Sequence, residues 1–93
     1  MTKTQKQRDK QIRHALTAAC EQIKSTLTGF AYLTHTVDLN NEANSIKVTC
    51  YFDDELAYQQ HQAQLDTLKK VIVAQLAQIN LPIKPAAITF LAD

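Results

Sequence analysis

The sequence predicts an α+β domain with the order α-β-β-α-β, in which two helices pack on one face of a three-stranded sheet. Three observations lead to this fold class. Apolar residues recur at helical spacing in an N-terminal and a central segment, two alternating segments flank a polar turn, and a short alternating segment follows two prolines. Because 93 residues suit one domain, we predict a basic arm at residues 1–10 and a single α+β domain at residues 11–93.

The first helix is predicted over residues 4–27. Its apolar residues fall three and four positions apart and form one stripe, which consists of Ile12, Leu16, Ala19, Cys20, Ile23 and Leu27. Gly29 follows where a left-handed turn would end the helix. The stripe is absent before Gln11, so we expect residues 1–10 to fray.

A β-hairpin is predicted from residues 30–39 and from the stretch SIKVTCYFDDE at residues 45–55, with a turn between them. Alternation assigns to the core Leu33, His35, Val37, Leu39, Ile46, Val48, Cys50 and Phe52. Both apolar faces point to one core only if the two residue numbers of each cross-strand pair add up to an odd number. We favour a sum of 85, which sets His35 opposite Cys50 and Asp38 opposite Lys47, while sums of 83 and 87 stay open.

A second helix is predicted over residues 55–79 and ends before Pro82, and a last strand is predicted over residues 86–91. The place of this last strand in the sheet stays open. Two helices on one side leave the other face of the sheet uncovered. That open face would carry Tyr32, Thr34, Thr36, Lys47, Thr49, Tyr51 and Thr89.

The composition excludes several classes of protein. The only glycine is Gly29, which rules out a Gly-rich phosphate loop. No apolar run approaches the ~18 residues of a membrane helix. The N-terminus is polar and lacks the apolar region of a signal peptide, so we expect a cytoplasmic protein without membrane contact. Cys20 and Cys50 match no zinc-finger spacing and are expected to be free thiols.

The order of elements resembles the type II KH-like fold and, within it, ribosome-binding factor A. The resemblance spans roughly residues 12–93 and includes GFAYLTHTVDL, SIKVTCYFDDE and PAAITFLAD. KH domains grip nucleic acid with a Gly-x-x-Gly loop, and the ribosome factor has an Ala-x-Gly kink between its helices. This chain has neither, so no binding residue is carried over.

The segments GFAYLTHTV and IKVTCYFD also resemble small uncharacterised gamma-proteobacterial proteins, some of which carry a Fis-type transcriptional-regulator label. Fis ends in a helix-turn-helix, whereas this chain ends in IKPAAITFLAD, which predicts a strand. The resemblance therefore implies a bacterial cytoplasmic protein and does not support the label.

Two groups of residues look chemically active, and each has a structural interpretation. Asp53, Asp54 and Glu55 diverge along the chain, which favours a helix N-cap over a metal site. His35, Cys50 and Cys20 suit zinc or a Cys–His nucleophile. They lack a fourth ligand or an oxyanion hole, so we favour core packing and predict no metal, cofactor, catalytic residue or small-molecule substrate.

Binding is therefore the predicted function, and we expect no enzymatic activity. Residues 1–13 have a net charge of +4 in a chain of net charge +1, and basic stripes attract phosphate backbones. We predict association with nucleic acid or the ribosome through Lys3, Lys6, Arg8, Lys10, Arg13 and Lys47. The open sheet face offers the rival prediction of a protein–protein adaptor or homodimer, through Tyr32, Thr34, Thr49 and Tyr51. A Cys/His metal or thiol site is the third alternative.

Overall fold

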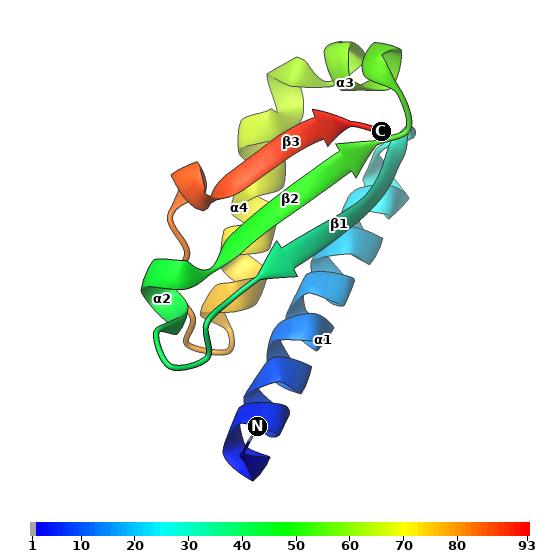
Figure 1. The fold of residues 1–93 in the computed structure, drawn as a ribbon. Coiled ribbons are helices and arrows are strands. Elements are labelled where there is room, and N and C mark those ends of the chain that lie inside the picture. The colour runs from blue at the N-terminus through cyan, green and yellow to red at the C-terminus, as the bar shows by residue number, and fades with distance from the viewer. Residues whose placement is uncertain (1) are drawn as a thin grey trace.

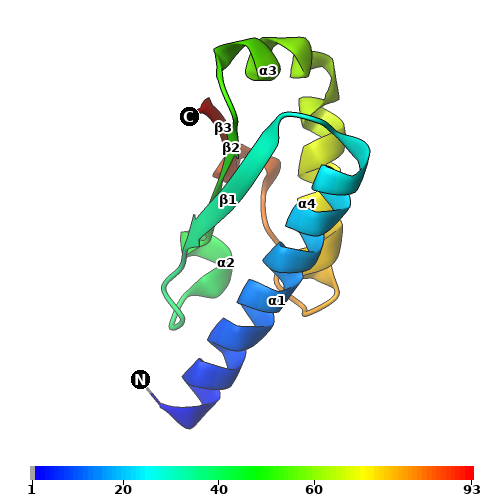
Figure 2. The ribbon, with the colours of Figure 1, turned by 90° about the vertical axis from the view of Figure 1, so that its right-hand side faces the viewer.

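The structure of the chain, a computed structural model, describes residues 2–93. It is an α+β domain with a long N-terminal helix and a three-stranded mixed sheet in the order β1-β2-β3. Figure 1 looks onto the open face of the sheet, and Figure 2 shows helices α1 and α4 together on the other side. The predicted fold class, with two helices on one face of a three-stranded sheet, is confirmed.

Helix α1 (Lys3–Thr26) begins with a capping box, in which the Thr2 side chain accepts from the Gln5 backbone and the Gln5 side chain accepts from the Thr2 backbone. Residues 3–10, predicted as an arm, thus belong to this helix, and its first turns extend past the sheet in Figure 1. The apolar stripe faces the core as predicted, with the addition of Ala15. The buried residues of α1 are Ile12, Ala15, Leu16, Ala19 and Ile23.

The hairpin consists of β1 (Phe30–Thr36) and β2 (Lys47–Phe52), which pair antiparallel. The favoured register was wrong: Leu33 pairs with Cys50 and His35 with Val48, a sum of 83. This sum is odd, so both apolar faces still point to one core, but His35 does not lie opposite Cys50.

The loop between the strands decides the register. Strand β1 ends at Thr36, and Asp38 begins a compact turn instead of pairing with Lys47. The Asp38 backbone N–H donates to Ser45 Oγ at 2.7 Å, and its carbonyl oxygen accepts from the Asn41 backbone at 2.9 Å. A single helical turn, α2 (Glu42–Ser45), completes the loop. Residues 37–39 belong to this loop and not to β1. Val48 and Cys50 therefore pair with β1 residues that lie two positions earlier than predicted.

An irregularity between Phe30 and Tyr32 changes which way Phe30 points. Phe30 pairs with Phe52, whereas Tyr32 pairs with Tyr51, so Ala31 is the extra residue of a bulge. The bulge turns Phe30 into the core, where its ring meets that of Phe52 edge to face at 5.8 Å. Tyr32 stays on the open face.

The segment predicted as one helix over residues 55–79 is divided, so this boundary was wrong. It forms α3 (Glu55–Gln60), a 3₁₀ turn η1 (Gln62–Gln64) and α4 (Leu65–Ala77). His61 lies between α3 and η1 and is fixed there by two contacts. Its Nε2 donates to the Thr28 carbonyl oxygen at 2.8 Å, and its ring stacks on that of Phe52. Thr28 lies 33 positions away and Phe52 belongs to β2, so no pattern within residues 55–79 marks the break.

The chain then forms a 3₁₀ turn, η2 (Pro85–Ala87), and strand β3 (Ile88–Ala92). Strand β3 lies beside β2 and parallel to it, with Val48 opposite Ile88 and Cys50 opposite Phe90. A parallel pair needs a crossover connection, and the segment from α3 to α4 supplies it. Among residues 2–93, none of the helices combines the length and the apolar character that a membrane crossing requires.

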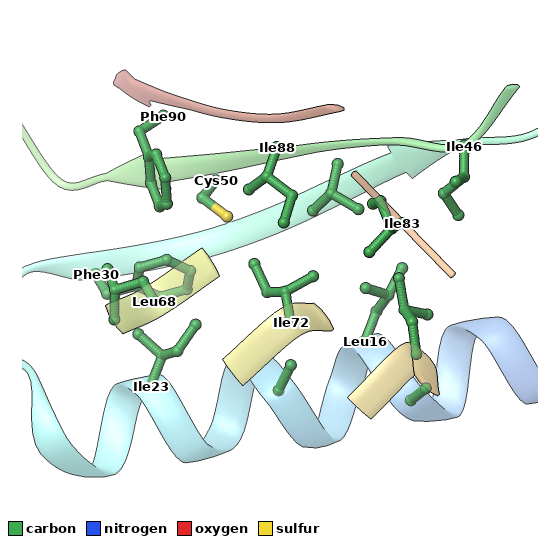
Figure 3. Close-up of a cluster of buried hydrophobic side chains, with 14 of the residues drawn as sticks. Leu16, Ile23, Phe30, Ile46, Cys50, Leu68, Ile72, Ile83, Ile88 and Phe90 are labelled. Carbon is green, nitrogen blue, oxygen red and sulfur yellow. The ribbon is translucent and has the colours of Figure 1, made fainter. Parts of the chain in front are cut away.

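One hydrophobic core fills the space between the sheet and the two long helices (Figure 3). As the alternation predicts, the core includes Ile46, directly before β2, and Val48, Cys50 and Phe52 of β2, and each of them is at most 2% exposed. No polar or charged residue of the described chain is buried. The polar residues that are predicted to bind a partner are therefore exposed or only partly buried.

Candidate functional site

The predicted basic stripe is present on α1, but its members differ in what they contact. Lys3, Lys6 and Lys10 are exposed and form no ion pair within residues 2–93. They follow one another at spacings of three and four, so they project from one face of the helix. This face lies on the turns that extend past the sheet in Figure 1.

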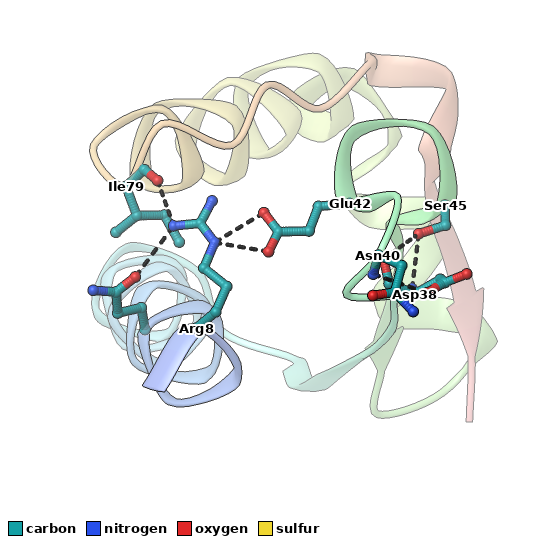
Figure 4. A network of polar contacts seen from close by, with 7 residues as sticks. Arg8, Asp38, Asn40, Glu42, Ser45 and Ile79 are labelled. Carbon is teal, nitrogen blue, oxygen red and sulfur yellow. Dashed lines mark hydrogen bonds and ion pairs between the residues drawn. The ribbon is translucent and has the colours of Figure 1, made fainter. Parts of the chain in front are cut away.

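Arg8 has a different role, because its guanidinium group binds other residues of the chain (Figure 4). Its Nε lies 2.9 and 3.0 Å from the two carboxylate oxygens of Glu42. Its Nη1 donates to the carbonyl oxygen of Ile79 at 2.6 Å and to Gln11 Oε1 at 3.2 Å. One side chain thus joins α1 to α2 and to the residues after α4, and we leave Arg8 out of the candidate interface.

Arg13 stays at the surface. Its Nη2 lies 2.9 Å from Asp9 Oδ2, one turn earlier on the helix, and the Arg13 side chain is 62% exposed. Such an exposed pair contributes little to stability. Arg13 is therefore available to a partner, at the cost of a weak contact.

A groove of about 420 Å³ runs between α1 and the edge strand β1, in line with the basic stripe. Arg13 and Lys24 line it from α1 together with Glu21, and His35 lines it from β1. Burial lowers the pKa of His35, an effect that nearby Asp9 opposes and Arg13 reinforces. Arg13 and Lys24 thus continue the row of basic side chains of α1 into the groove, where Glu21 and Asp9, the partner of Arg13, offset their charge.

The two cysteines and His35 do not form one site, because Cys20 lines the groove with His35 whereas Cys50 lies in the core. Cys50 is fully buried at the centre of β2 opposite Leu33, and Cys20 is half-buried in the groove. Burial, and then the neighbouring Cys20, raise the pKa of the Cys50 thiol to about 12. Within residues 2–93, no group of three or more His, Cys, Asp or Glu side chains is placed to hold a metal ion. Cys50 is thus a protonated core side chain.

The acidic residues after β2 divide their roles. Asp54 is the N-cap of α3, and its Oδ1 accepts from the Ala57 backbone at 2.8 Å. This confirms the cap that we favoured over a metal site. Glu55 lies in the first turn of α3, and Asp53 is exposed directly after the strand.

The open sheet face brings together Tyr32 and Tyr51, as predicted. They pair across the two strands, and their rings stack with centroids 4.7 Å apart. Thr34 and Thr49 form the adjacent pair on the same face. Lys47 begins β2 and lies on this face by alternation, whereas the other predicted lysines belong to α1, which packs on the opposite side of the sheet in Figure 2.

One exposed apolar residue of this face was missed. Leu91 is 46% exposed and lies in register with Tyr51, so it extends the aromatic pair to β3. The alternation of Ile88 and Phe90 toward the core already implied that Leu91 points outward.

A second hollow, of about 400 Å³, was also not anticipated. It lies beside α4 and is lined by Asp66, Lys69, Lys70, Val73 and Pro85. Its charges are of both signs and all its side chains are ordinary surface residues, so it indicates no particular ligand.

The chain matches no protein-family model, no curated protein and no solved structure. The resemblance to the KH-like fold therefore stays a prediction.

Proposed function

We propose that this domain is a non-enzymatic cytoplasmic binding module that contacts the phosphate backbone of nucleic acid, free or within a ribonucleoprotein. The observation that carries the proposal is the exposed row of Lys3, Lys6 and Lys10 on α1, whose ammonium groups have no carboxylate partner in residues 2–93. Such a row attracts phosphates without reading sequence.

The groove beside α1 supports a path for the chain of phosphates. Arg13 follows Lys10 on the same side of the helix, and Lys24 lies further along it in the groove wall. Basic side chains thus recur along α1 from Lys3 to Lys24, with Asp9 and Glu21 as the acidic residues near the groove. The open sheet face is left out of this proposal, because Asp53 and Asp93 border it and would repel phosphate.

The test is binding of fluorescently labelled single-stranded RNA, single-stranded DNA and duplex DNA, measured by anisotropy over a range of salt concentrations. Contacts with three phosphates of a single strand predict a slope of log affinity against log salt of about −2, so affinity should fall ~20-fold between about 50 and about 200 mM salt. The variant Lys3→Glu/Lys6→Glu/Lys10→Glu should lose binding to all three probes.

The matched control is Lys69→Glu/Lys70→Glu/Lys84→Glu, which makes the same change in net charge away from α1. It should keep most of the affinity, because binding depends on the lysines that contact phosphate and not on the net charge of the chain. Equal losses in the two variants, or wild-type binding that does not depend on salt, would contradict the proposal.

A further inference from the structure

The face of the sheet that the helices leave open has its apolar side chains in one row across the strands. Tyr32, Tyr51 and Leu91 lie in register on β1, β2 and β3. Tyr32 is 42% exposed and Leu91 46%, which leaves an apolar strip open to water. The adjacent row is uniform and consists of Thr34, Thr49 and Thr89.

The two ends of this face carry opposite charges. Lys47 begins β2 at one end, whereas Asp53 and Asp93 directly follow β2 and β3 at the other. The Asp53 backbone donates to the Gly29 carbonyl oxygen at 2.8 Å, and the Asp93 backbone donates to that of Phe52 at 2.9 Å. The extended pairing thus continues to both aspartates, and alternation places them on the face of Lys47.

Asp93 also acts on the Tyr32 side chain of this face. Partial removal from water, and then the nearby carboxylate of Asp93, raise the pKa of the Tyr32 phenol. In the described part of the chain, none of Lys47, Asp53 and Asp93 forms an ion pair within the fold.

A face with this arrangement is complementary to itself. A two-fold axis that lies between two such faces and runs across the strands reverses the strand direction, so the Lys47 end of one copy meets the aspartate end of the other. With the axis at the level of Cys50, Lys47 faces Asp53 and Thr49 faces Tyr51 of the second copy. The threonine row of each copy then covers the Tyr–Tyr–Leu row of the other.

We propose that a second copy of this chain covers the open sheet face in this two-fold arrangement, with two Lys47–Asp53 ion pairs at its ends. This inference goes beyond the proposed function, since it uses the opposite side of the sheet and needs no nucleic acid. In the resulting dimer the sheets face each other and both α1 helices lie outside. The dimer would therefore present two basic faces.

The area of the face sets the strength of this dimer. Three strands about 4.8 Å apart, with an outward face about 20 Å long, offer roughly 300 Å² per copy. A standard stable interface buries ~800 Å² per partner, so the dimer should be weak and depend on concentration. We expect monomers at micromolar and dimers at millimolar concentration.

The test is the molecular mass from sedimentation equilibrium, with nucleic acid removed by nuclease and at low ionic strength, where ion pairs are least screened. Two charge variants separate this face from other modes of association. Lys47→Glu makes both ends acidic, and Asp53→Lys/Asp93→Lys makes both ends basic. Each variant alone should stay monomeric at millimolar concentration, whereas their equimolar mixture should form a heterodimer.

The control Lys70→Glu makes the same charge change as Lys47→Glu on α4 and should dimerise as the wild type does. Circular dichroism verifies that each variant is folded. A wild-type chain that stays monomeric at millimolar concentration overturns the inference. So does a wild-type dimer that persists in both face variants, or a mixture of the variants that stays monomeric while the wild type pairs.

Discussion

Arg8 provides the sharpest test of which basic residues of α1 belong to the fold. The change is Arg8→Met, which keeps most of the apolar stem and removes the guanidinium group. The Arg8 and Glu42 side chains are 21% and 22% exposed, so their ion pair is only partly screened by water. The change also leaves the Ile79 carbonyl oxygen without its 2.6 Å donor.

The expected loss follows from these contacts. A hydrogen bond to a charged group contributes ~1.5–3 kcal/mol, and an orphaned, partly buried acceptor costs ~1–3 kcal/mol. After discounting for the remaining exposure, we expect Arg8→Met to lower the free energy of unfolding by about 2–3 kcal/mol. In a domain of this size the midpoint of thermal unfolding should fall by roughly 10–20 °C.

The assay is urea unfolding followed by circular dichroism, with Arg13→Met as the matched control. Arg13 lies on the same helix, but its pair with Asp9 is exposed, so its loss should be at most about 0.5 kcal/mol. A double-mutant cycle with Glu42→Gln should give a coupling energy of about 1 kcal/mol or more. Equal losses for Arg8→Met and Arg13→Met would refute the reasoning and return Arg8 to the candidate interface.

Three further predictions concern single side chains. Gly29→Ala should lower the free energy of unfolding by about 1–3 kcal/mol, because Gly29 has a φ of +96° and an added Cβ would lie 2.9 Å from that of Ala57. The loss should be smaller when it is measured in an Ala57→Gly background. The Cys50 thiol, with its pKa near 12 and no exposure, should resist a thiol reagent at pH 8 in the folded chain, whereas the half-buried Cys20 reacts. Two rapidly reacting thiols in folded protein would contradict this burial. His35 has a pKa below its unfolded value, so the unfolded chain binds the proton more readily. The neutral form therefore contributes stability above the unfolded pKa, and this stability is lost as the pH falls from about 6.5 toward the folded pKa. A His35→Asn variant cannot titrate at this position and should lose that part of the pH dependence. If the free energies of unfolding of variant and wild type differ by the same amount across this pH range, the reasoning is wrong.

Local pattern was sufficient for most of the core. The apolar alternation of residues 46–52 assigned every buried side chain of β2 correctly, and the helical spacing from Ile12 to Leu27 predicted the buried stripe of α1. Asp54 was correctly included among the candidate caps, because its chemistry acts within one helical turn. The outward position of Leu91 was available from the same alternation.

Features that depend on partners outside the same helix or strand were not readable in this way. The register differed from the favoured one because hydrogen bonds between Asp38 and Ser45 use residues that the alternation assigned to a strand. The helix predicted over residues 55–79 is divided because His61 bonds to Thr28, 33 positions away. Arg8 could not be separated from the other basic residues, since its partner Glu42 lies 34 positions along the chain.

The sequence by itself determined the order of the main elements, most of the core-facing residues and the uneven distribution of charge, because burial and helix capping act through spacings of two to four residues. Only the tertiary structure decided the parallel position of β3, the register of the hairpin and the contacts of each basic residue. These depend on which segments meet after the chain has collapsed. The parallel pairing of β3 with β2 also places Asp93 at the same end of the open face as Asp53, opposite the end of Lys47.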